Sequence, residues 1–360
     1  MLSSPPSSPT PPTEPSAPTE PSAPTEPSAP TPAAPTLADP TAPDPSVPDP
    51  DGPRAVLPRR GRAIVVAALL CALLMALPDL VPNGFGNLGS LLQTLLPWTG
   101  LAVPLLLALA TVRRSRTAAA AVLVPAVAWA CVHGPALIDK RAPGGDFTVV
   151  SHNVDEGNAD PAGTARALAA SGADLLALEE LSRKSAPTYA RELAGAYPYH
   201  EVREGVGLWS KRPLTDVEPV PIMPWTRALR ATVDTPKGPV AVYAAHLASV
   251  RVFPTAGFTT RLRNEAAGKL AEALRAEPLP RVIVLGDFNG SVDDSALDVL
   301  TSPLRSAQRE AGDGFGFTWP ASFPVVRIDQ VMTKGLAPVS SWTLPATGSD
   351  HLPVAAALRL

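Results

Sequence analysis

The strongest structural signal in the chain is the stretch Val282-Ile283-Val284-Leu285-Gly286-Asp287-Phe288-Asn289. Its aliphatic run predicts a strand that is buried on both faces. Gly286 frees the backbone, and Asp287 and Asn289 stand two residues apart, so their side chains leave an extended segment on the same side. A carboxylate and a carboxamide held in fixed relation are groups that acid–base and phosphate chemistry use. An ordinary Asp/Asn turn after a strand explains this octapeptide equally well.

Length and composition limit the classes of protein that the chain can belong to. Its 360 residues allow two or more structural units. The formal net charge is −3, so no overall field draws the protein to nucleic acid. The two cysteines, Cys71 and Cys131, both lie in apolar runs, so the region after Lys140 contains neither an internal disulfide nor a thiolate metal site.

Residues 1–58 hold most of the excess proline of the chain. The hexapeptide that begins at Thr13 repeats from Thr19 and again from Thr25. Such a segment has too little apolar surface to offset the entropy lost on ordering, so we expect a disordered tail. No apolar run follows the first methionine, as a signal peptide would require.

Residues 59–140 form a membrane region in this interpretation. Three apolar runs, at about 63–81, 95–112 and 117–138, predict three transmembrane helices. A buried soluble hairpin is the alternative, but three such runs between arginine clusters disfavour it. The arginines precede the first run and separate the second from the third, whereas residues 82–94 contain no Lys or Arg. The sequence therefore predicts a multi-pass protein of the cell membrane. The positive-inside rule places its tail in the cytoplasm and everything after Asp139 on the extracytoplasmic side.

Residues 141–360 read as one soluble domain of alternating strands and helices. Their succession predicts a two-layer α/β sandwich. Strands are expected near 147–151, 174–178, 207–210, 228–233, 240–245, 282–287, 327–333 and 353–358, and helices near 164–171, 189–196, 261–276 and 295–300.

Polar residues follow or precede many of these strands. Each has an ordinary structural explanation by itself, such as a cap or a turn, but they recur at strand ends throughout the domain. Oxygen ligands and two histidines without cysteine fit a hard divalent cation such as Mg²⁺ better than zinc. The residues are Asn153, Glu179, Glu180, His246, Asp287, Asn289, Asp329, Asp350 and His351.

Six ordered segments carry a resemblance to a known family, and the match covers residues 146–360. They are Ser151-His152-Asn153-Val154, Asp174 to Glu180, Ala245-His246-Leu247, Gly286-Asp287-Phe288-Asn289, Arg327-Ile328-Asp329 and Ser349 to Val354. Together they resemble the motifs of the endonuclease/exonuclease/phosphatase superfamily, which includes DNase I-like nucleases. The resemblance implies an α/β fold in a four-layer α/β/β/α sandwich and metal-dependent hydrolysis of phosphoric esters.

The same resemblance implies roles for single residues. Glu180, with Asn153 beside it, corresponds to the metal-binding group, for Mg²⁺ or alternatively Mn²⁺, and Asp350 to a metal-side or supporting carboxylate. A glutamine is common in the family where Glu179 stands, so the choice between Glu179 and Glu180 stays open. Asp287 corresponds to the residue that orients or deprotonates the attacking water.

Four further residues are implied to contact the phosphate or to support those that do. Asn289 is a phosphate or water donor, and His246 donates to the phosphate or the leaving oxygen. His351 contacts phosphoryl oxygens, held by Asp329. Arg227 is a possible phosphate contact, with a solvated surface arginine as the alternative.

The substrate is a separate question, because fold kinship does not determine it. We expect a cell-envelope, lipid-linked phosphate, since three spans would tether the domain and no basic stripe for nucleic acid is evident. The layout is similar to membrane proteins of the VanJ teicoplanin-resistance type. A surface-anchored nuclease is the alternative, and a non-catalytic membrane adaptor is a second one.

Overall fold

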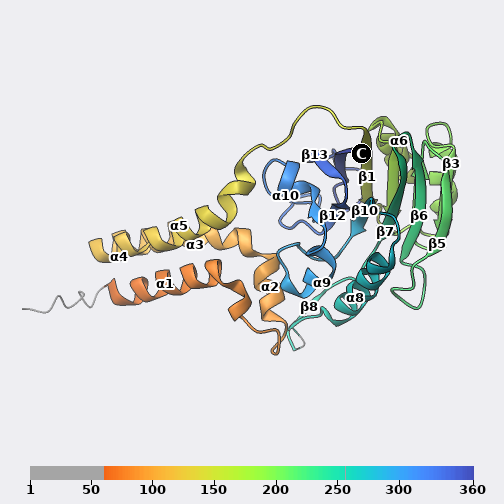
Figure 1. Cartoon of the computed structure of the whole chain (residues 1–360). Coiled ribbons are helices and arrows are strands. Elements are labelled where there is room, and N and C mark those ends of the chain that lie inside the picture. The colour runs from red at the N-terminus through yellow and green to blue at the C-terminus, as the bar shows by residue number, and fades with distance from the viewer. Residues whose placement is uncertain (1–60, 256) are drawn as a thin grey trace, which may run out of the picture. The chain divides into compact units, whose positions relative to one another are not determined.

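The computed structural model describes residues 61–255 and 257–360. The disordered tail predicted at residues 1–58 lies outside these residues. The described chain comprises a helical region, whose last turn ends at Leu137, and an α/β domain, whose first strand begins at Phe147 (Figure 1).

One sheet of the domain has six strands in the order β13-β14-β1-β2-β4-β3. β1 pairs parallel with β2 and antiparallel with β14, so the sheet is mixed. β2 is buried along its whole length, as expected of an aliphatic strand with both faces covered. The bounds are β1 Phe147–Asn153, β2 Leu175–Glu179, β3 Tyr199–Arg203, β4 Val206–Ser210, β13 Ala337–Thr343 and β14 Val354–Arg359.

The other large sheet has six strands in the order β11-β12-β10-β7-β6-β5. At its centre β10 pairs parallel with β7 and antiparallel with β12, and every residue of β10 is buried. The bounds are β5 Leu214–Pro219, β6 Ala228–Thr235, β7 Gly238–Ala245, β10 Val282–Asp287, β11 Arg305–Ser306 and β12 Asp329–Lys334; β8 Val252–Phe253 and β9 Gly257–Phe258 pair separately.

The two large sheets pack face to face, and helices cover their outer faces (Figure 1). Helices α6 (Pro161–Ala170) and α7 (Ala186–Leu193) pack on the first sheet, and α8 (Arg261–Ala276) and α9 (Asp298–Thr301) on the second. A short helix, α10 (Ala307–Ala311), follows β11. The α/β fold and the four layers implied by the resemblance are confirmed. The two-layer prediction is wrong, because the order of elements does not reveal that the strands divide between two sheets.

The helical region contains five α-helices joined by turns. Small residues allow close packing of α1 against α3 and the α4–α5 helix, with Ala68, Leu106 and Val122 at the contact. The bounds are α1 Arg62–Ala76, α2 Leu88–Thr94, α3 Ala102–Val112, α4 Arg116–Ala121 and α5 Leu123–His133, with 3₁₀ turns at Pro78–Leu80, Leu96–Leu101, Gly134–Leu137 and, in the domain, Ser295–Leu297.

The structure does not support the prediction of three transmembrane helices. One helix in the described chain, Arg116–Leu137 with 22 residues, is long and apolar enough to cross a membrane. The segment Leu96–Val112 passes that test only together with α2, from which it is bent by 75°. Helix α1 has 15 residues and ends at Ala76, because Pro78 follows closely. A straight crossing needs about 20 residues.

Several polar contacts join the helical region to the α/β domain, and three of them involve α2 and the turn after it. The Ser90 hydroxyl donates to Asp294 Oδ1 at 2.9 Å, and the Ser295 amide donates to Gln93 Oε1 at 3.0 Å. The Trp98 indole N–H donates to the Val325 carbonyl at 2.7 Å. Helix α2 and the turn after it are therefore held directly against the domain.

Candidate active site

The polar residues predicted at strand ends meet at one edge of the two facing sheets. β1 and β2 run parallel and end at Asn153 and Glu179, and the parallel pair β7 and β10 ends at Ala245 and Asp287. β12 runs antiparallel to β10 and pairs Asp329 with Asp287, so it starts where β10 ends. The strand directions thus bring residues from distant parts of the sequence to one place.

Asp287 lies at the centre of this group and is buried. Its Oδ2 accepts hydrogen bonds from the side-chain amides of Asn153 at 3.0 Å and Asn289 at 3.1 Å. Its Oδ1 accepts one from the backbone N–H of Asn289 at 2.8 Å. Asn289 Nδ2 also donates to the Leu247 carbonyl at 3.0 Å. Both amides are therefore fixed, and they orient the carboxylate.

The backbone around Asp287 has two conformations that limit the choice of residue. Gly286 has φ +145°, and a Cβ there would stand 1.9 Å from the Ala245 carbonyl oxygen. Asn289 has φ 47°, a left-handed conformation that asparagine tolerates better than most residues. Glycine before Asp287 is therefore required for β10 to approach β7 closely.

Two histidines flank Asp287. Their Nε2 atoms lie 3.6 Å (His246) and 4.0 Å (His351) from Asp287 Oδ2. His351 Nδ1 is 3.0 Å from Asp329 Oδ2, so the buried Asp329 carboxylate fixes the orientation of that imidazole. Asp287, His351 and Asp329 thus form a continuous polar chain.

The electrostatics of the site separate the two histidines. Burial alone lowers the pKa of His351, but Asp329, Asp287 and Asp350 outweigh it and raise that pKa to about 10. Burial, with the neighbouring Arg227 charge, holds the pKa of His246 well below its usual value. Burial and the charge of Asp329 raise the pKa of Asp287 to about 7. The site therefore combines a cationic His351, a neutral His246 and a carboxyl group that titrates near neutrality.

Arg227 contacts the ring of His246. Its Nη1 lies 2.8 Å from His246 Nε2, and it also contacts Nδ1. A guanidinium only donates hydrogen bonds, so the ring nitrogen that accepts one from Arg227 carries no proton. This agrees with the lowered pKa of His246 and places a permanent cation at the site.

The two neighbouring glutamates have different environments. Glu180 has φ 58°, and its Oε1 lies 3.5 Å from His246 Nε2, with about a third of its side chain exposed (34%). Glu179 is fully buried and accepts a hydrogen bond from the Ser151 hydroxyl at 3.1 Å, and burial raises its pKa. Left-handed backbone at a residue other than Gly or Asn costs on the order of 1 kcal/mol or more and clusters at functional sites. Glu180 is therefore the glutamate presented to the site.

Asp350 lies beside His351, whereas Glu180 lies beside His246. Its Oδ1 is 3.8 Å from His351 Nε2, and its Oδ2 accepts a hydrogen bond from the Trp319 indole at 3.1 Å. More than half of its side chain is exposed (57%). The predicted metal-side residues Asn153 and Glu180 are thus near His246 or Asp287, whereas Asp350 is at the His351 rim.

The site has groups that fit a divalent cation. Ligand atoms of Asp287, Asp329 and His351 lie within 4.8 Å of one another. However, both Asp329 oxygens face His351 Nδ1, and a cationic imidazole does not ligate a metal. Glu180, with a partly exposed carboxylate 3.5 Å from His246 Nε2, is the better anchor, and oxygen donors suit a hard cation.

Two supporting residues were not singled out from the sequence. Ser349 Oγ donates to the Asn153 carbonyl at 2.6 Å and accepts from the His351 amide at 3.0 Å. Its position beside Asp350-His351 was a usable signal. Thr318 Oγ1 lies 3.4 Å from the Asp329 amide nitrogen, which donates to it, and nothing in the sequence marks that contact.

Comparison with known proteins identifies the family of the chain. The sequence profile of the Endonuclease/Exonuclease/phosphatase family matches residues 150–351, more than half of the chain. The chain belongs to this family. No curated protein sequence matches the chain significantly.

Solved structures of low sequence identity share the fold. An endonuclease/exonuclease/phosphatase from Beutenbergia cavernae has a TM-score of 0.50 at 21% identity and covers 60% of this chain and 72% of its own. D. rerio TDP2 complexed with a single strand DNA product has a TM-score of 0.50 at 18% identity, covering 59% and 99%. An endonuclease/exonuclease/phosphatase from Bacteroides vulgatus has a TM-score of 0.50 at 14% identity, and the match covers 60% of this chain and 100% of that one. Members of the family are hydrolases of phosphate esters and are typically dependent on a divalent metal.

Proposed function

We propose that the protein is a membrane-anchored, Mg²⁺-dependent phosphoesterase whose domain faces the extracytoplasmic side and whose substrate is a lipid-linked phosphate of the cell envelope. The observation that carries the hydrolytic part is the fixed group of Asp287, Asn289 and the His351–Asp329 pair. The family membership supports the class of reaction. The anchor and the substrate rest on the helical region.

In this mechanism Asp287 accepts the proton of the attacking water. Its pKa of about 7 suits a general base near neutral pH, and its three hydrogen bonds hold it in one orientation. Asn289 keeps its amide beside the same oxygen and so positions the water or a phosphate oxygen.

Two cationic side chains stabilise the negative charge of the phosphoryl group. His351, kept charged by Asp329, donates from Nε2, and Arg227 offers a guanidinium from the His246 side. His246 is neutral and has one N–H to offer to the phosphate or the leaving oxygen. Phosphoryl transfer depends chiefly on such charge stabilisation and positioning.

A divalent cation would be held by Glu180 with Asn153, and Asp350 would support it from the His351 rim. Such a cation, when bound, neutralises charge on the phosphoryl oxygens. Mg²⁺ is the expected metal because the donors are oxygens, with Mn²⁺ as the alternative.

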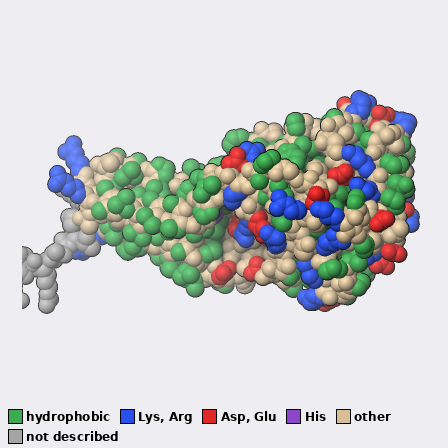
Figure 2. Space-filling model, turned by 45° about the horizontal axis from the view of Figure 1, so that its top comes forward, with side chains coloured by type: hydrophobic (Ala, Val, Ile, Leu, Met, Phe, Trp, Pro, Cys, Tyr) green, Lys and Arg blue, Asp and Glu red, His purple; other side chains and the backbone are tan. Residues whose placement is uncertain are grey.

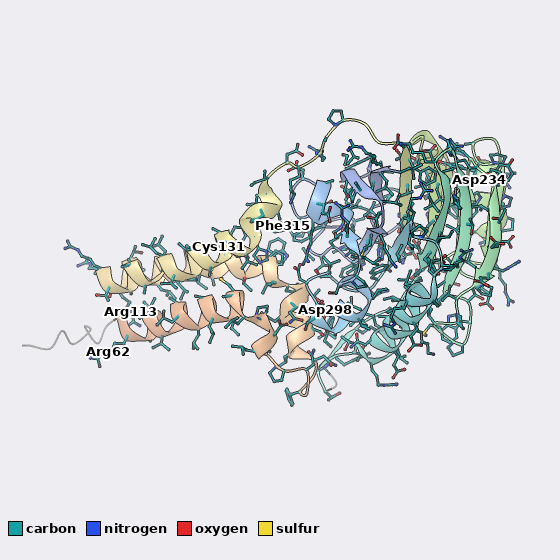
Figure 3. All side chains as sticks on the ribbon, viewed as in Figure 1. Arg62, Arg113, Cys131, Asp234, Asp298 and Phe315 are labelled. Carbon is teal, nitrogen blue, oxygen red and sulfur yellow. The ribbon has the colours of Figure 1, made fainter. Side chains whose placement is uncertain are left out.

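The membrane anchor is supported by the composition of the helical region. Arg116–Leu137 is long enough to cross a membrane, and several large aliphatic side chains of α1, α3 and α5 are exposed. Arg62 and Arg113 lie at the same end of these helices (Figure 3). That end would face the cytoplasm by the positive-inside rule. The layout favours a member similar to the VanJ-type proteins.

The test is hydrolysis by the full chain in detergent, with polyprenyl pyrophosphate and plasmid DNA as parallel substrates. We expect Mg²⁺-dependent phosphate release, abolished by EDTA and lowered about 10²–10⁴-fold by Asp287→Asn. Asp234→Asn, at an exposed aspartate of β6 (labelled in Figure 3), is the matched control.

Each other outcome has a definite meaning. Nicking of DNA without lipid turnover would establish the nuclease alternative. Inactivity on both substrates, with or without Mg²⁺, would favour the non-catalytic adaptor. Full activity of Asp287→Asn would refute the assigned base.

A further inference from the structure

A second group of buried polar atoms lies outside the catalytic centre. In the described chain Arg327 Nε and Nη2, Gln330 Oε1 and His133 Nε2 are buried and have no hydrogen-bond partner. All three residues line one cavity of about 370 Å³ between the helical region and the domain. Buried polar groups without partners are rare in proteins and call for an explanation such as a ligand.

Arg327 is the most demanding member of this group. Only 7% of the residue is exposed, and the one side-chain hydrogen bond that the structure shows for it runs from Nη1 to the Gly316 carbonyl at 2.8 Å. Burial lowers its pKa to about 10, so the guanidinium is still charged at neutral pH. The charge of Asp329 acts in the opposite direction but does not outweigh burial, and neither Nε nor Nη2 has a hydrogen-bond partner, so an anion against these two atoms would lower the cost of burying the charge.

The loop beside Arg327 is shaped to leave this space. Gly316 has φ +59°, and a Cβ there would stand 2.6 Å from Arg327 Nη1. Gly314 is also left-handed, with φ +64°. The loop therefore passes close to the guanidinium at Gly316 because that residue has no Cβ.

The other charges on the cavity wall favour an anion. Lys140 and Arg309 line it together with Arg327, against the single carboxylate of Asp293. Asp293 is paired with Arg309. The lining thus carries more positive than negative charge, and the unpaired excess includes the buried guanidinium.

An apolar cavity of about 470 Å³ adjoins this polar one. Pro97, Phe315 and Phe317 line both. Trp98 stacks on Phe317 with ring centroids 5.8 Å apart, and Trp129 meets the edge of Phe315 at 6.4 Å. Phe315 lies at the end of the domain that meets α5 (labelled in Figure 3).

The indole N–H groups of the apolar cavity are already satisfied. Trp98 donates to Val325, and Trp129 donates to the Pro97 carbonyl at 2.8 Å. The space between them is therefore lined by carbon and has the size of an ordinary ligand pocket, roughly 300–1,000 Å³. Its walls come from the turn Leu96–Leu101, from α3 and α5, and from two phenylalanines of the domain, so a hydrocarbon chain is the natural occupant.

We propose that the two cavities bind one anionic lipid, with its phosphate headgroup against Arg327 and its hydrocarbon chain among Trp98, Trp129 and Phe315. The linings of the two cavities include none of Asp287, Asp329 and His351, although Arg327 is close enough to Asp329 for that carboxylate to act on its pKa. Gln330 follows Asp329 directly on β12, so the two side chains leave opposite faces of that strand. The proposal needs the helical region to meet lipid but does not need the protein to be a hydrolase.

The test uses the full chain in detergent and three probes: lysophosphatidic acid, lysophosphatidylcholine of the same chain length, and inorganic phosphate. Binding is measured by isothermal titration calorimetry. We expect one lysophosphatidic acid per protein, bound about tenfold or more tighter than lysophosphatidylcholine, since charged hydrogen bonds carry the preference. Phosphate alone should bind much more weakly.

Variants separate the headgroup from the chain. Arg327→Gln should remove the preference between the two lipids, and Arg309→Gln, at an arginine with 56% of its side chain exposed, should reduce it without risk to folding. Ala126→Phe fills the apolar cavity and should weaken both lipids equally while leaving hydrolysis of a soluble phosphoester unchanged. Arg191→Gln, in the exposed part of α7, is the control.

Several results would overturn this proposal. Equal binding of the two lipids to the unaltered protein would show that no headgroup site exists. A preference that survives in a folded Arg327→Gln would show that Arg327 does not form it. Phosphate binding as tightly as lysophosphatidic acid would remove the chain site. Asp287→Asn should bind the lipid normally, so failure of the proposed hydrolase and failure of this site give different results.

Discussion

The helical region and the α/β domain distribute their side chains in opposite ways. In the helical region Leu105, Leu123 and Val127 are each at least 60% exposed, whereas Ser90 and Gln93 are almost completely buried. In the domain the aliphatic residues fill the core, and charged side chains are spread over the surface (Figure 2). Apolar surface on this scale is unusual for a protein face that meets water. The difference indicates two regions adapted to two surroundings, lipid and water.

The sharpest way to test this comparison is at the joint between the regions, where Asp294 is completely buried. It receives hydrogen bonds from Ser90 at 2.9 Å and from Arg263 Nη2 at 2.6 Å. Asp294→Ala leaves the buried Arg263 without its counterion, so we expect a loss of about 3–5 kcal/mol in the free energy of unfolding. Arg263 also donates to the Asn289 carbonyl, so hydrolysis should fall as well.

Urea unfolding of the full chain in detergent, followed by tryptophan fluorescence, measures this loss. Glu265→Ala breaks the exposed pair with Arg261 on the same helix and should cost only about 0.3–0.5 kcal/mol. Equal effects of the two variants would show that the joint contributes no more than a surface contact.

A charge on the exposed face of the helical region should have the next largest effect. Leu105 on α3 is 61% exposed. Leu105→Asp would cost about 3 kcal/mol if this face lies in hydrocarbon, because an aspartate at the centre of a membrane helix is disfavoured by roughly that amount. The measurement is the share of protein that sediments with membranes and resists alkaline carbonate extraction.

Leu262→Asp supplies the matched control. Leu262 lies on α8 of the domain and is 49% exposed, so its replacement should leave membrane association unchanged. If Leu105→Asp resists carbonate extraction as well as the unaltered protein does, the exposed face of α3 does not meet lipid. The difference between the two regions would then need another explanation.

Much of the catalytic centre was predictable because strand-end motifs carry it. Asp287 and Asn289 follow an aliphatic run, and a parallel strand brings its end to the same edge as its neighbour's. The orientation of Asp350 toward Trp319 was not predictable, because the tryptophan comes from a loop with no strand pattern. The choice between Glu179 and Glu180 depends on a left-handed backbone conformation that no sequence pattern announces.

The helical region was less predictable for a different reason. Hydropathy reports how apolar a run is but not whether it stays straight. The run at 95–112 begins with a 3₁₀ turn containing Pro97, and the run at 63–81 is interrupted by Pro78. Composition averaged over such a window conceals both breaks, so three apolar runs gave an overcount of continuous helices.

The smallest expected effect is a dependence of stability on pH, and it concerns a carboxylate of the α/β domain, the region that meets water. Glu277 accepts hydrogen bonds from Arg230 Nε and Nη2, both at 3.1 Å, and from the Tyr243 hydroxyl at 2.7 Å. Burial raises the pKa of Glu277, but these hydrogen bonds outweigh it and leave the pKa lowered. The ionised form is therefore favoured by folding, and its contribution is present above the unfolded pKa of about 4.3.

That contribution should disappear as the pH falls through the lowered pKa of the folded state. Glu277→Gln keeps one carbonyl oxygen for Arg230, so we expect a loss of about 1–2 kcal/mol at pH 7 and a much smaller one near pH 3. Urea unfolding at a series of pH values measures this difference, with the exposed Glu272→Gln on the same helix as control. Membrane association of both variants should match that of the unaltered protein. A loss that is equal at all pH values would mean that the glutamine packs poorly and that the charge of Glu277 contributes nothing to stability.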